Sequence, residues 1–137
     1  MTGELDLTTL LHGMQAVLAP DTYVFVTLPD RAVPPGLTPR LIFDEAEGTT
    51  LILPLAQAQA AGLDAEFPCR MITLNVHSAL EAVGFIARIA TELAAHGMGV
   101  NPVAGFYHDH LFVPQDRADD AMKLLAALAA TPATPSS

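Results

Sequence analysis

The sequence has 137 residues, of which 51% are apolar, and a formal net charge of −9. This length and apolar content fit one medium domain or two small ones with a real core, and they exclude a disordered chain. The acidic excess argues against nucleic acid or an anionic membrane as a partner, because both require basic patches. No apolar run approaches the ~20 residues of a membrane span, and no secretory signal is visible. We therefore expect a cytoplasmic protein.

The first half of the chain predicts a helix, three strands and a second helix. Apolar residues at helical spacing mark the first helix, and β-branched and aromatic residues mark the strand after it. A proline-rich stretch then predicts a loop, and two short apolar runs around a turn predict a hairpin. The expected elements are a helix over 5–18, a strand over 22–28, a loop over 29–39, a hairpin of 41–43 with 49–53, and a helix over 55–61 that ends at Gly62.

The second half predicts strand, helix, hairpin and helix, after a link over residues 64–68. In the strand over 69–77, Ile72 and Leu74 share the core face by alternation. Ser78 and Glu81 form a capping-box pattern for the next helix, in which Gly84 would be a surface position and which Gly97 ends. The remaining expected elements are hairpin strands over 100–107 and 108–113, a final helix with core positions Ala118, Ala121, Met122, Leu125 and Leu128, and a disordered tail over 131–137.

This order of elements predicts an α+β fold of two related units. Both halves contain a helix, a strand pair and a helix, which indicates a diverged internal duplication. The second half lacks only the last strand of a βαββαβ unit, the ferredoxin-like arrangement. We expect two ferredoxin-like βαββα units, over 1–66 and 67–130, with an antiparallel sheet and helices on one face.

Several segments of the chain resemble a known family, the bacterial stand-alone tandem ACT-domain proteins. The resemblance extends from about residue 5 to residue 128 and is more specific in the second half. That half is also similar to the ACT repeats of the eukaryotic cytosolic arginine sensors, in which an aspartate matches Asp109. The segments that carry the resemblance are residues 45–51, 67–74, 99–103 and 104–113.

The resemblance implies a regulatory module that binds an amino acid or another small molecule where units meet, with no catalytic activity and no cofactor. A homodimer is implied as well. The family's ligand loop, between the first strand and the first helix of a unit, carries an aspartate and a glycine in many members, whereas this chain has glycine only at Gly84. Asp109 is expected to contact a ligand amine or to cap a turn. The other ligand-binding residues implied are His77, Ser78, Ala79, Leu80, Glu81, Asn101, Pro102 and Val103.

Two other functions stay open. His108 and His110 point the same way on a strand and could share a metal with His77 as a third ligand, in a metal-binding or enzymatic protein. His-Asp-His is not a specific metal pattern, and the simpler interpretation is a hairpin whose polar face is lined by histidines. The third possibility is a ligand-free homo-oligomeric interaction module that uses its edge strands. No catalytic set or phosphate-binding loop stands out, and Cys69 is expected to be a buried, inert thiol.

Overall fold

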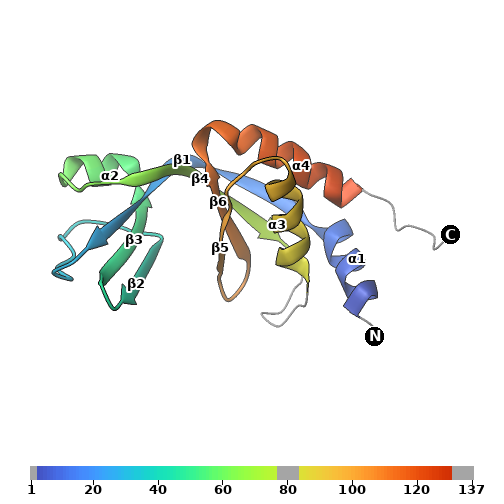
Figure 1. Cartoon of the computed structure of the whole chain (residues 1–137), viewed down its shortest axis with the longest axis horizontal. Helices are drawn as coiled ribbons and strands as arrows, with labels where there is room; N and C mark the ends of the chain where they lie inside the picture. Colours follow the sequence, from blue (N-terminus) through green and yellow to red (C-terminus); the bar gives the residue numbers. More distant parts are fainter. Residues whose placement is uncertain (1–2, 77–83, 131–137) are drawn as a thin grey trace.

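One six-stranded antiparallel sheet organises the molecule, in a computed structural model that describes residues 3–76 and 84–130 (Figure 1). Its strand order is β2-β3-β1-β4-β6-β5. The predicted order of elements and the α+β class are confirmed. The elements are α1 (Gly3–Gly13), β1 (Gln15–Leu28), β2 (Leu41–Glu45), β3 (Gly48–Pro54), α2 (Leu55–Ala60), β4 (Glu66–Asn75), α3 (Phe85–Ala95), β5 (Asn101–Ala104), β6 (Asp109–Pro114), the 3₁₀ turn η1 (Gln115–Arg117) and α4 (Ala118–Ala130).

Several predicted boundaries are wrong, including that of the strand over 100–107, of which only Asn101–Ala104 forms β5. The first helix ends at Gly13, and residues 15–18 belong to β1 because they pair with β4. The expected link over 64–68 is cut short, since β4 already begins at Glu66. Gly84 has a positive φ of 84° and stands immediately before α3, so no helix continues through it. The predicted cap at Ser78 and Glu81 lies outside the described residues.

The strands β1 and β4 are shared between the two halves. Residues 23–28 of β1 pair with β3, whereas residues 15–18 pair only with β4, next to β6. In a complete βαββαβ unit, the last strand would lie beside β4. In this chain the N-terminal part of β1 occupies that position. Register shifts interrupt the β1–β4 pairing after Leu18 and after Tyr23, where bulges increase the local twist. The sheet is accordingly strongly curled (Figure 1).

The helices cover one face of the sheet, as predicted. Ile72 and Leu74 are fully buried there beneath α3 and α4, which confirms the predicted core face of β4. A smaller cluster under α2 contains Val24, Val26 and Leu53. The predicted core positions of α4 are also confirmed: Ala118, Ala121, Leu125 and Leu128 are buried, and Met122 packs against them. None of the helices in residues 3–76 and 84–130 has the length and apolarity to cross a membrane.

The opposite face of the sheet, here called the inner face, has its own apolar cluster. No helical residue of the described chain belongs to it. Aromatic rings meet edge to face there, with centroids 6.0 Å apart for Tyr23 and Phe112, and 5.7 Å apart for Phe25 and Phe67. The curl of the sheet turns the inner face toward the space between the two hairpins (Figure 1). The cluster comprises buried Tyr23, Ile52, Cys69, Met71 and Phe112, with Ala19, Phe25, Leu41, Phe67 and Val103 partly buried.

Candidate functional site

Of the predicted ligand residues, the described ones are Asn101, Pro102, Val103 and Asp109, all in the second half of the chain. There β4 ends at Asn75, α3 begins at Phe85 and β6 begins at Asp109 (Figure 1). Residues 77–81, which include five of the predicted ligand residues, connect β4 to α3 and lie outside the described residues. The structure therefore reports only on the surroundings of that loop.

Asp109 is a partly buried carboxyl group on the helix-covered face. It stands opposite Leu74 of β4 and Ala104 of β5, and Leu74 belongs to the core beneath the helices. Burial raises the pKa of the Asp109 carboxyl, and the nearby His110 imidazole only partly offsets that effect. Burial therefore leaves the ionised Asp109 carboxylate with reduced hydration on the helix-covered face of the sheet.

The start of α3 has backbone N–H groups that no described side chain caps. Gly84 occupies the N-cap position and supplies no side-chain acceptor, and the first turn contains no acidic residue. Arg88 donates the first helical bond, to the Gly84 carbonyl, at 2.9 Å. The N–H groups before Arg88 have no partner within the helix, and the helix dipole adds a partial positive charge there. This end of α3 can accept an anionic group.

The predicted residues of β5 divide between the two faces of the sheet. Pro102 stands opposite Leu111, which is buried beneath the helices, so it shares the face of Asp109. Asn101 and Val103 stand opposite Phe112 and His110, on the inner face. The strand thus brings Pro102 near Asp109 but separates both from Asn101 and Val103.

The two histidines of the second hairpin lie close together. The ring centroids of His108 and His110 are 6.5 Å apart, and His110 Nδ1 lies 3.0 Å from the Thr73 hydroxyl oxygen. His108 Nδ1 is buried and has no hydrogen-bond partner among the described residues. A search of residues 3–76 and 84–130 finds no group of three or more side chains that could hold a metal. The metal hypothesis depends on His77, outside the described residues, and stays a prediction.

Sequence reasoning missed a polar group on the inner face, at Arg40 and Tyr23. Arg40 Nε donates a hydrogen bond of 3.1 Å to the Tyr23 hydroxyl, and the guanidinium carbon lies 6.0 Å from the centre of that ring. Burial lowers the pKa of His110, and the positive charges of His108 and Arg40 lower it further. Arg40 and His110 therefore interact across the inner face, although no motif in the sequence connects them.

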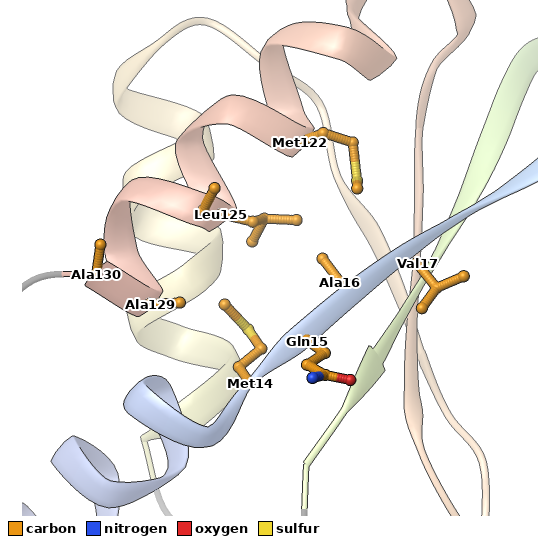
Figure 2. A pocket seen from close by; sticks show the side chains of 9 residues that line it. Met14, Gln15, Ala16, Val17, Met122, Leu125, Ala129 and Ala130 are labelled. Carbon is orange, nitrogen blue, oxygen red and sulfur yellow. The ribbon is translucent and has the colours of Figure 1, made fainter.

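An open apolar groove of about 580 Å³ separates the start of β1 from α4 (Figure 2). Met14 and Ala16 point toward α4, whereas Val17 points away from it (Figure 2). Only one of the nine lining residues is polar, so the groove offers little for recognising a charged ligand. The lining residues are Met14, Gln15, Ala16, Val17, Met122, Leu125, Ala126, Ala129 and Ala130.

Family comparison identifies both halves of the chain. A profile of the ACT domain matches residues 2–70, and a second ACT domain profile matches residues 66–127. The chain belongs to the ACT domain family. The predicted resemblance to tandem ACT proteins is thereby confirmed, whereas the similarity to the arginine sensors stays a prediction. ACT domains are regulatory modules that bind small molecules such as amino acids, and they often dimerise.

Solved structures share this arrangement over most of the chain. A Vibrio cholerae protein of unknown function, described as a possible transport protein, is 41% identical and has a TM-score of 0.83, with 93% of this chain and 99% of that chain covered. An Agrobacterium tumefaciens protein is 16% identical, with a TM-score of 0.73 and coverage of 85% and 89%. The ligand-free regulatory subunit of aspartate kinase from Thermus thermophilus is 11% identical, with a TM-score of 0.63 and coverage of 82% and 95%. No curated protein matches the sequence.

Proposed function

We propose that this tandem ACT protein is a regulatory module that binds an amino acid at the end of its second unit, beside Asp109 and the start of α3. Two observations support the proposal: the partly buried carboxyl group of Asp109, and the start of α3, which has no capping side chain among the described residues. A free amino acid carries one positive and one negative group. The two features offer one complementary partner for each.

Electrostatics supports this assignment of the two groups. The N–H groups at the start of α3 suit the ligand carboxylate, because a helix N-terminus favours negative charge. The raised pKa of Asp109 means that its ionised form is poorly solvated in the empty protein. A ligand ammonium group beside Asp109 would stabilise that ionised form. Residues 77–81 and Pro102 stay our predicted contacts for the rest of the ligand.

The biological setting follows from the family. Aspartate kinase regulatory subunits and domains are among the structures that share the fold, although their identity to this chain is too low to transfer a ligand. We propose that the chain acts without catalysis of its own, in the cytoplasm, as a homodimer, and that it reports the level of its ligand to a separate partner.

The test is a thermal-shift screen of the full chain against the free amino acids. We expect at least one to raise the unfolding temperature with a saturable concentration dependence, because a ligand of the folded state stabilises it by mass action. Asp109→Asn should remove most of that response. Asp64→Asn, which changes an exposed carboxylate in the loop before β4, is the matched control and should respond as the wild type does.

A flat screen would contradict the proposal, and so would an equal loss of response in the two variants. The amino-acid screen does not depend on whether the protein binds a metal. Metal analysis of tag-free protein, with His108→Ala as the comparison, tests that alternative directly.

A further inference from the structure

We propose that the inner face of the sheet holds a second ligand site, which binds the carboxylate of a small molecule with an aromatic body through Arg40. The site combines a fixed guanidinium from the first half of the chain, polar groups of β4 and β6 from the second half, and the aromatic cluster between them. It is distinct from the amino-acid site beside Asp109, which lies on the helix-covered face.

Arg40 is held in one position by its own backbone and by Tyr23. Its backbone N–H donates to the Ile52 carbonyl oxygen at 2.7 Å, and its Nε donates to the Tyr23 hydroxyl. Tyr23 is itself almost fully buried, so the guanidinium rests on a rigid support. The hydrogen bond uses Nε, which leaves the two terminal amino groups free of partners among the described residues. Two parallel donors of this kind fit a carboxylate.

Arg40 has no carboxylate partner among the described residues, although the chain is strongly acidic. Acidic side chains outnumber lysine and arginine by 15 to 6, and Arg31, Arg88 and Arg117 each form an ion pair. Arg70 instead donates to the Ala19 carbonyl oxygen. In so acidic a protein, an exposed and positioned guanidinium without an acidic partner among the described residues is a natural anchor for an external anion.

The second unit supplies the facing wall. Arg40 is linked to this wall through Tyr23, whose ring centroid lies 6.0 Å from that of Phe112, two residues beyond His110 on β6. The Thr73 hydroxyl lies 3.0 Å from His110 Nδ1. Among the described residues, the carboxylate that acts on His110 is that of Asp109, which points to the opposite face by strand alternation. The Arg40 side of His110 therefore carries positive charge and hydrogen-bonding groups without a described acid to neutralise them, an arrangement that favours an anionic group.

The aromatic cluster supplies the place for the ligand body. Phe112 lies two residues beyond His110 on the same face of β6 and meets the rings of Tyr23 and Phe25 edge to face. Phe25 and Phe67 are only partly buried, so they still present ring surface. A ligand ring placed against them would extend the same edge-to-face packing. The preferred ligand class is therefore a carboxylate joined to an aromatic or similarly apolar body.

Isothermal titration calorimetry with 3-phenylpropanoate tests the site on the full chain at neutral pH. This probe has no amine, so its binding does not require Asp109. We expect saturable binding by the wild type, about tenfold to a hundredfold weaker binding by Arg40→Gln, and a similar loss when the neutral probe 3-phenylpropanamide replaces the carboxylate. Arg88→Gln, which removes an exposed arginine of α3, is the matched control and should bind as the wild type does.

Localisation comes from NMR on the same samples. The probe should shift the ring signals of His110 and the methyl signal of Thr73 in the wild type but not in Arg40→Gln. Tyr23→Phe is the second variant, because it removes only the hydroxyl that positions Arg40 and should weaken binding while leaving the circular dichroism spectrum unchanged.

The proposal is overturned if the probe gives no saturable binding, or if Arg40→Gln and Arg88→Gln weaken it equally. It is also overturned if the amide binds as well as the carboxylate. Retention of 3-phenylpropanoate binding in Asp109→Asn would confirm that the two sites are separate. A flat amino-acid screen together with Arg40-dependent binding of the probe would refute the proposed function and leave the inner-face site standing.

Discussion

Gly48, the first residue of β3, is the position where a single methyl group should disturb the sheet most directly. Its φ is 154°, and a Cβ added there would lie 2.7 Å from the Leu28 carbonyl oxygen and 3.0 Å from the Pro29 Cα. Both are backbone atoms that cannot rotate away. The β1–β3 ladder holds Leu28 opposite Thr49, next to Gly48, so relief of the contact requires the two strands to separate.

The expected cost of Gly48→Ala has two parts. The unfavourable backbone conformation costs about 1–3 kcal/mol for a residue with a side chain. The contact with the backbone of Leu28 adds about 1–3 kcal/mol, as overpacking does in a core. Gly62→Ala is the matched control, because Gly62 also has a positive φ, of 67°, but its added Cβ would meet nothing within 4 Å. It should lose only about 1–2 kcal/mol.

Urea denaturation of the two variants and the wild type measures the difference. With a slope of about 1–3 kcal/mol/M, Gly48→Ala should lower the midpoint by roughly 1 M more than Gly62→Ala does. Equal midpoints for the two variants would refute the reasoning. The close approach of Gly48 to Leu28 would then not constrain the β1–β3 pairing.

Three further predictions concern titratable groups. Because folding raises the pKa of Asp109, the free energy of unfolding should fall as pH rises above the ordinary value of 3.8. Asp109→Asn should increase the unfolding temperature at pH 7 and flatten that pH dependence. The pKa of His110 is lowered instead, so stability should decline as pH drops below 6.5, and His110→Gln should reduce that decline in urea titrations at pH 5 and pH 7. Burial raises the pKa of Cys69 from 9.0 to about 12, so its reaction with a disulfide reagent at pH 8 should be about a thousandfold slower in the folded chain than in urea; comparable rates would contradict its burial.

Sequence patterns were sufficient for most of the fold because local signals agreed with the tertiary structure. The spacing of apolar residues predicted the hairpins, the final helix and the core face at Ile72 and Leu74, and the packing in the structure agrees with it. The helix predicted at the start of β1 was wrong for a physical reason. Met14 and Leu18 are spaced as on a helix, but in the structure Met14, Ala16 and Leu18 alternate toward the core under α4, and pairing with β4 decides the conformation. Gly13 was the available signal for the helix end.

The site was less accessible to sequence reasoning than the fold. Asp109 was predicted as a ligand residue because it matches a family position, and this stays a prediction; its face depends on the register with Leu74, which no local pattern fixes. Arg40 and His110 are 70 positions apart in the sequence, and β3, β1 and β4 lie between β6 and β2, the strand that follows Arg40. The bulges that increase the twist of β1 are a property of strand pairing. Residue spacing in the sequence therefore cannot predict an inner-face site of this kind.

The sharing of β1 and β4 has a consequence for cooperativity. Residues 15–18 of β1 complete the sheet beside β4, and the next part of the same strand holds β3 in place. Neither half can lose its order without leaving an unpaired strand edge in the other, so we expect a single unfolding transition and no stable half-molecule. A small molecule bound at either end would then slow hydrogen exchange at the far end as well, through a continuous backbone and without any change of shape.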